Sequence, residues 1–231
     1  MDSAPNDLIF YCIVLGCGTL LPWNAFLSNL DYIGMLYPSC KLDYLTAANF
    51  AGNLLFLIVQ LQWTGNRHSK ALIGITIHLI VVAYILFIVF HVKDISAPDW
   101  KASEQASFSA LIVGMTLSGG ACASLQGSLF SIAGQHEGGG KLCGCLMTGA
   151  ALAGVLACAF SIGSKELYST PPAATDSLRR GALISLGCSL AVTLLAAILL
   201  PPFLTRARRL RRQAVVAHIS AMLAQDDSYG A

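Results

Sequence analysis

The sequence has 231 residues, of which 55% are hydrophobic and only 11% are charged, and its mean hydropathy is +0.67. A soluble domain carries about 25% charged residues, so this composition excludes an ordinary water-soluble globule. The formal net charge of +2 is small, and five arginines gather in one short stretch, 205–213. Because this cluster directly follows a hydrophobic run, it indicates membrane orientation and not a nucleic-acid partner.

Six uncharged runs divide the chain, and each is long enough to cross a membrane as a helix. A helix needs about 20 apolar residues to span a hydrocarbon core about 30 Å thick. We therefore predict an all-α fold in which residues 1–204 form a polytopic membrane bundle of six transmembrane helices in the lipid bilayer. The predicted spans are residues 8–30, 44–66, 71–92, 105–135, 142–164 and 181–204. A soluble bundle would need polar outer faces at helical period, and these runs lack them.

The first span contains the stretch GCGTLLPWNAF at residues 16–26. Pro22 removes a backbone donor, so we expect a bend in the helix and a free carbonyl near residue 18. Four residues share one helix face, because they stand at i, i+3, i+4 and i+7: Leu20, Trp23, Asn24 and Leu27. This face predicts a recognition surface for a ligand with a flat ring and hydrogen-bonding edges. The alternative is that Trp23 anchors the helix at the headgroup region and Asn24 only joins two helices.

Buried amides in the other spans need partners, since lipid offers none. They are Asn49, Asn53, Gln60 and Gln126. For Gln126, a bond between helices and contact with a ligand both stay open. Small residues recur at spacing four in the spans 105–135 and 142–164, which predicts close packing of helix backbones.

Basic residues are distributed unequally between the two sets of connections. With the amino terminus inside, eight basic residues lie on the inner side and six on the outer side, so we expect a cytosolic amino terminus. Residues 205–231 are expected to form a basic cytosolic tail. Leu210, Ala214, Ala217 and Ala221 stand at helical spacing there, which is compatible with an amphipathic helix on the membrane surface.

No acids, bases or nucleophiles converge within the predicted spans, and no phosphate loop or nucleophile elbow occurs. We therefore predict no catalytic residue, no metal site, no cofactor and no enzymatic activity.

The stretch at 16–26 resembles the first-span signature of the equilibrative nucleoside transporters. SLQGSLFSIAG at 124–134, followed by TGAALAG at 148–154, resembles the fourth and fifth spans of that family. The resemblance implies a carrier whose fold is similar to the major facilitator type and which moves nucleosides or nucleobases by alternating access. It implies that Leu20, Trp23 and Asn24 line the nucleobase side of the site, that Leu27 borders it, and that Gln126 hydrogen-bonds the base.

The chain ends where the second half of such a carrier would begin. The resemblance therefore implies the amino-terminal half, or a truncated form, of a carrier, with a second copy or a separate carboxyl-side half as its partner. The plasma membrane is the expected location, in preference to an intracellular membrane. A non-transporting interaction or regulatory protein, which pairs with full-length carriers through its Gly/Ala faces, is the alternative function.

Overall fold

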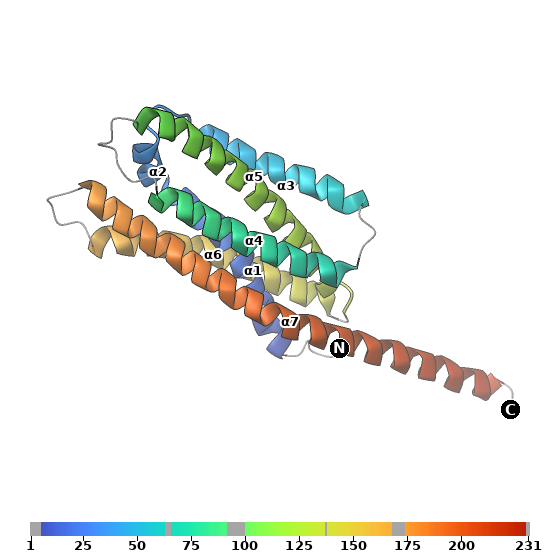
Figure 1. Cartoon of the computed structure of the whole chain (residues 1–231). Coiled ribbons are helices and arrows are strands. Elements are labelled where there is room, and N and C mark those ends of the chain that lie inside the picture. Colours follow the sequence, from blue (N-terminus) through green and yellow to red (C-terminus); the bar gives the residue numbers. More distant parts are fainter. Residues whose placement is uncertain (1–5, 63–65, 92–99, 137, 168–173, 230–231) are drawn as a thin grey trace.

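The structure is a computed structural model, and it describes residues 6–62, 66–91, 100–136, 138–167 and 174–229. Every regular element in these ranges is an α-helix, so the predicted all-α fold is confirmed. Figure 1 shows the helices in chain order: α1 (Asn6–Leu27), α2 (Leu30–Leu36), α3 (Asp43–Gln62), α4 (Arg67–His91), α5 (Trp100–Ala133), α6 (Gly139–Leu167) and α7 (Ala174–Tyr229).

Six helices among the described residues are long and apolar enough to cross a membrane, and they form the predicted polytopic bundle. They are α1 and α3 to α7. The first of them ends at Leu27, before the predicted boundary at residue 30. Asn29 folds back beyond this end, and its Nδ2 donates a hydrogen bond to the carbonyl oxygen of Ala25 at 2.6 Å. The short helix α2 was not predicted, because seven residues give too few turns for a periodic pattern.

Paired glycines set the crossing of α1 and α6. A Cβ atom on Gly16 would overlap the backbone carbonyl of Leu146, and one on Gly149 would overlap the carbonyl of Ile13. The two backbones therefore touch at a point where neither helix has a side chain. This is the close packing predicted from the small residues of this segment.

The crossing of α3 and α5 is built in the same way. A Cβ atom on Gly52 would overlap the carbonyl of Thr116, and one on Gly119 would overlap the carbonyl of Asn49. Asn49 Nδ2 also donates a hydrogen bond to the carbonyl oxygen of Met115 at 3.2 Å. One of the buried amides is therefore satisfied by the neighbouring helix.

The six spans form two consecutive triplets, first α1, α3 and α4 and then α5, α6 and α7. The first helix of each triplet packs mainly against helices of the other triplet. The first helix of the first triplet, α1, packs mainly against α6 and α7, the second and third helices of the other triplet. The first helix of the second triplet, α5, packs mainly against α3 and α4 in turn. Figure 1 shows α3 beside α5, and α1 among α6 and α7. The two triplets thus make equivalent sets of contacts, as internal repeats do in transporter folds.

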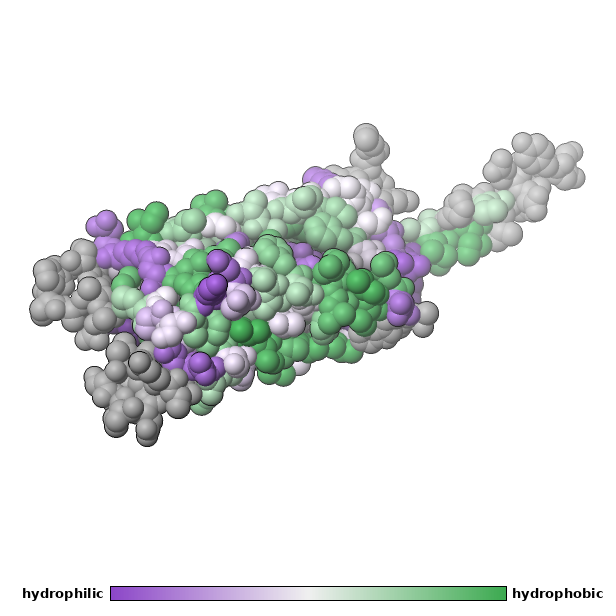
Figure 2. All heavy atoms as spheres, turned by 90° about the horizontal axis from the view of Figure 1, so that it is seen from above, coloured by the Kyte–Doolittle hydropathy of each residue, from purple (hydrophilic) through white to green (hydrophobic). Residues whose placement is uncertain are grey.

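Apolar side chains cover much of the outside of the bundle. In the face shown in Figure 2 they extend over most of its length, and hydrophilic side chains gather mainly towards its ends. The least covered spans are α3 and α6, with exposed residues such as Phe50, Leu54, Leu152 and Val155. Such a surface suits contact with lipid or with another apolar bundle.

The last helix continues without a break through Pro201 and Pro202 to Tyr229 and extends beyond the bundle (Figure 1). The basic stretch after residue 204 is therefore helical and continuous with the last span. Arg206 Nε lies 3.2 Å from Asp7 Oδ2, which joins α7 to the beginning of α1. The arginines of α7 and the start of α1 thus lie at the same end of the bundle.

Candidate functional site

Pro22 lies inside α1, and its effect on the helix can be followed to a neighbouring span. The carbonyl oxygen four residues earlier belongs to Gly18, and Pro22 has no N–H group to donate to it. Thr193 Oγ1 of α7 lies 3.5 Å from this oxygen, although its hydroxyl is closer, at 2.8 Å, to the carbonyl oxygen of Ser189 in its own helix. The carbonyl that the sequence predicted to be free is therefore contacted by α7.

Trp23 lies half-buried between α1 and α3. Its ring lies nearly parallel to that of Phe26, with centroids 6.3 Å apart, and meets the Phe50 ring of α3 edge-on at 6.1 Å. Phe50 keeps 61% of its surface exposed. An aromatic wall built from two helices is thus partly open on its outer side, and a planar ligand can stack there.

Asn24 is half-buried one position further along α1. Its Nδ2 lies 3.8 Å from the position that a Cβ atom on Gly154 of α6 would take. The Asn24 carboxamide has no hydrogen-bond partner among the described residues. Because a polar group in a membrane bundle needs a partner, this carboxamide is available to a ligand.

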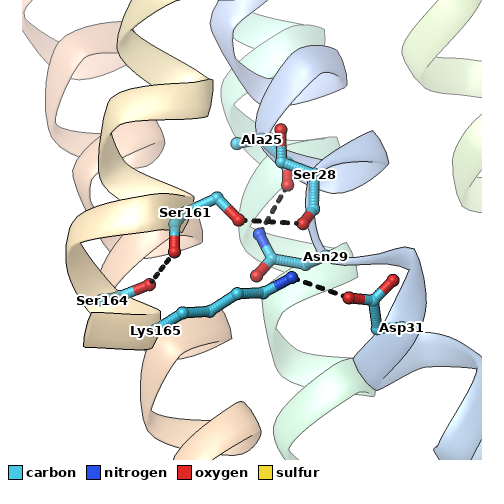
Figure 3. Close-up of polar contacts among 7 residues, drawn as sticks. All are labelled: Ala25, Ser28, Asn29, Asp31, Ser161, Ser164 and Lys165. Atoms are coloured by element: carbon cyan, nitrogen blue, oxygen red, sulfur yellow. Dashed lines mark hydrogen bonds and ion pairs between the residues drawn. The ribbon is translucent and has the colours of Figure 1, made fainter. Parts of the chain in front are cut away.

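Polar contacts hold the end of α1 against α6, as Figure 3 shows. Ser28 donates its hydroxyl hydrogen bond to the Asn24 carbonyl at 2.9 Å, and Ser161 of α6 donates to the Ser28 carbonyl at 3.1 Å. Lys165 Nζ lies 2.7 Å from Asp31 Oδ2 just beyond. The Lys165 and Asp31 side chains are 46% and 63% exposed, so water weakens this ion pair. The serine contacts fix the last turn of α1 and therefore the position of Asn24.

The two leucines of the predicted face are half-buried as well. Leu20 packs against a small cluster formed by α1 and α6, which contains Cys17, Ala153 and Ala157. Leu27 is the last residue of α1. All four residues of the predicted α1 face are thus partly covered and none is fully buried.

Gln126 projects from α5 towards α1. Its Nε2 lies 3.4 Å from Thr19 Oγ1, and the Thr19 hydroxyl donates to the carbonyl of Gly16 at 2.7 Å. Thr19 stands one helical turn before Trp23, so Gln126 reaches the same part of α1 as the predicted face. A bond between helices, one of the two roles left open for Gln126, is therefore present.

Two small spaces adjoin these residues. Trp23 lines one together with Phe26 and Met115, and Gln126 lines the other together with Thr19 and Leu146. Each holds about 10 Å³, which is room for about one water molecule. The described residues thus place the five predicted side chains along one region of α1 and α5 but do not enclose a cavity of ligand size around them.

Sequence reasoning missed two members of this region, Thr19 and Phe50. Thr19 gave no signal because a hydroxyl in a helix usually bonds its own backbone. Phe50 stands between Asn49 and Asn53, so an aromatic ring beside two intramembrane amides was the available signal. Gln60, another of the intramembrane amides, has a structural role: its Nε2 donates a hydrogen bond to the carbonyl of Ser124 at 2.9 Å and joins α3 to α5.

The region is electrically neutral. None of the described residues that line the two small spaces is charged. No group of three potential metal ligands occurs in the described part of the chain. The chemistry on offer is therefore aromatic stacking, apolar contact and hydrogen bonding by carboxamides.

Comparison with known proteins gives two relatives from Arabidopsis thaliana. The chain is 30% identical over 204 residues to a protein named Equilibrative nucleotide transporter 1, covering 85% of this chain and 43% of that protein. It is 26% identical over 125 residues to Equilibrative nucleotide transporter 8, covering 53% and 31%. The chain thus spans less than half the length of these relatives. No family model and no solved structure matches it.

Proposed function

Because the chain is related to the equilibrative nucleotide transporters, we propose that it forms part of a membrane carrier for nucleosides or nucleobases. Transport proceeds by alternating access, with the six spans as one of two bundles that move against each other. The relationship and the six apolar helices support a multi-pass membrane transporter. The substrate and the mechanism are our proposal.

One observation supports this substrate class above others. An indole at an aromatic wall, an unpartnered carboxamide and a second carboxamide from α5 lie along one neutral region of the bundle. A nucleobase has a flat ring and hydrogen-bonding edges, so Trp23 stacks on it while Asn24 and Gln126 bond its edges. Leu20 and Leu27 border the same face. The relatives are named for nucleotides, but the uncharged lining suits the base and sugar better than a phosphate.

The open surfaces of α3 and α6 support a site completed by a second bundle. Both helices expose apolar side chains, and the predicted α1 face borders each of them, since Trp23 contacts Phe50 of α3 and Asn24 lies near Gly154 of α6. A second copy of the chain or a separate carboxyl-side half is the proposed partner. We propose the plasma membrane as the location, with the amino terminus in the cytosol, and no enzymatic activity.

Uptake of radiolabelled uridine and adenosine tests the proposal directly. Transporter-deficient cells expressing the 231-residue chain should accumulate nucleoside above cells with an empty vector. Surface biotinylation confirms that the protein is present in the membrane. The variants Trp23→Ala and Gln126→Ala should reduce the apparent affinity, whereas Ile198→Ala, on an exposed part of α7, should not.

Background uptake of every nucleoside tested, with the protein in the membrane, would reject transport by this chain alone. Co-expression with a full-length relative then tests the regulatory alternative by co-purification. The geometry gives that alternative less support than the sequence did. Gly120 and Gly127 of α5 contact Phe56 and Gln60 of α3, so this small-residue face is already occupied within the chain.

A further inference from the structure

A cavity of about 870 Å³ lies at the end of the bundle where α4 begins, well away from Trp23. Its walls come from the start of α4, the turn after α5 and the extended part of α7. Six basic or titratable side chains line it: Arg67, His68, His136, Arg208, Arg211 and Arg212. None of them belongs to the neutral region proposed to bind substrate.

The arginines converge on the cavity from two helices. Arg208, Arg211 and Arg212 stand at i, i+3 and i+4 on α7 and therefore share one helix face. Arg67 lines the same cavity from α4, and its Nη1 lies 3.5 Å from the carbonyl oxygen of Ser131 at the end of α5. The positive charges thus come from two separate helices.

No carboxylate balances these charges among the described residues that line the cavity. Arg206, two residues before Arg208, pairs with Asp7 and does not line the cavity. Glu137 lies outside the described residues. Like charges in one concave space repel each other, and an anion bound between them offsets this repulsion.

His136, which also lines the cavity, is affected by the same positive charges. Burial, and after it the charge of Arg211, lowers the pKa of His136 below its ordinary value. The surroundings therefore disfavour one more positive charge at this place. An anion in the cavity would act in the opposite direction.

We propose that this basic cavity binds a phosphate-bearing anion. Guanidinium groups match phosphate oxygens in pairs of parallel hydrogen bonds, and several of them together hold more than one oxygen. The volume lies in the range of about 300–1,000 Å³ that is typical of small-molecule sites. Ile132, Ala207, Val215 and Val216 add an apolar wall, which suits a ligand larger than a bare ion.

Two sources supply such a phosphate: the headgroup of an anionic lipid and a soluble phosphate monoester. The first fits a basic cavity beside the end of a membrane span. The second fits a cavity that opens towards water. This inference does not depend on the proposed nucleoside transport, because none of its residues is shared.

The test uses the full chain in nanodiscs of phosphatidylcholine. The soluble arm measures binding of radiolabelled AMP, with inorganic phosphate as competitor and Trp23→Ala as a check that the α1 face is not the site observed. The lipid arm adds phosphatidylinositol 4-phosphate and counts retained lipid by native mass spectrometry, against phosphatidylcholine as reference.

The variants distinguish binding inside the cavity from non-specific attraction to the basic surface of α7. Arg211→Gln and Arg67→Gln should each weaken binding about tenfold, since each removes a charge-assisted hydrogen bond. Arg209→Gln is the matched control, because Arg209 is equally charged and exposed on α7 but does not line the cavity. It should change the affinity by less than about twofold. Arg208→Gln replaces Arg211→Gln if the latter does not elute as a folded protein.

Binding of AMP that phosphate competes away supports a soluble ligand, and selective retention of the phosphoinositide supports a lipid headgroup. Either result must show the stated difference between variants. Absence of binding in both arms overturns the proposal. Equal losses for Arg209→Gln and Arg211→Gln, or no effect of Arg67→Gln, overturn it as well, because the cavity would then not be the binding site.

Discussion

Trp23 combines a ring stacked on its own helix with an edge contact to α3. Replacement by alanine should weaken nucleoside binding about tenfold, because stacking of a base on an aromatic ring contributes about 1–3 kcal/mol. Replacement by phenylalanine should retain most of the affinity. Binding of radiolabelled uridine to the purified chain measures both. Equal affinity of Trp23→Ala and the parent chain would remove the indole from the site.

His136 offers a second test at the level of a single residue. Because burial and the charge of Arg211 lower its pKa, Arg211→Gln should raise that pKa while leaving the effect of burial in place. A pH titration of the histidine ring signals by NMR measures the change, with His136→Gln for assignment and Arg209→Gln as control. An unchanged or lower pKa in Arg211→Gln would contradict the assigned cause.

The lowered pKa of His136 makes the free energy of unfolding depend on pH. In the unfolded chain His136 takes up a proton near pH 6.5, and in the folded chain it does so only at lower pH. The free energy of unfolding should therefore fall as the pH drops through this window, and His136→Gln should reduce the fall. Thermal melting at pH 7 and at pH 5.5 compares the two chains.

The residues of the α1 face could be predicted from the sequence because helical spacing alone puts Leu20, Trp23, Asn24 and Leu27 on one side. Thr19 and Phe50 could not, since their roles depend on which neighbouring helix lies opposite. Single-sequence spacing says nothing about that choice. The pairing of Gln126 with Thr19 across 107 positions is of the same kind.

Helix crossings at glycine determine how the elements pack. Gly149→Ala places a methyl group on the carbonyl of Ile13, so it should destabilise the bundle by about 1–3 kcal/mol. Gly163→Ala is the matched control in the same helix, because nothing lies near its added Cβ atom. It should be neutral or stabilising, since alanine favours a helix more than glycine does. Thermal unfolding in detergent, followed by size-exclusion chromatography, compares the two, and equal melting temperatures would contradict the crossing.

The spans themselves could be predicted from uncharged length, and all six were. Their ends could be predicted less well. Asn29 closes α1 early through a backbone carbonyl, and α7 passes through two prolines that indicate a helix end in the sequence.

The distribution of basic residues predicts which end of the whole bundle faces the cytosol. The start of α1 and the arginines of α7 lie at one end, which we expect to face the cytosol. An epitope at the amino terminus should be reached by antibody only after permeabilisation, whereas one inserted after Ser39 should be reached in intact cells. Staining in the reverse order would invert the orientation.

The exchange of partners between the two triplets could not be predicted from the sequence, because any order of six apolar helices satisfies the same composition. It becomes visible only when α1 is seen against α6 and α7, and α5 against α3 and α4. This arrangement brings α1 and α5 together at Thr19 and Gln126, and it leaves α3 and α6 with open apolar sides.

Protection of a cysteine placed at residue 24 tests whether the α1 face contacts nucleoside in a water-accessible space. Asn24→Cys, with the native cysteines that are exposed or half-buried (Cys40, Cys143, Cys145, Cys158 and Cys188) replaced by serine, is treated with a water-soluble thiol reagent with and without uridine. We predict that the cysteine at residue 24 is labelled and that uridine slows its labelling. Absence of labelling, or labelling at the same rate with saturating uridine, would show that residue 24 does not lie in a water-accessible nucleoside site.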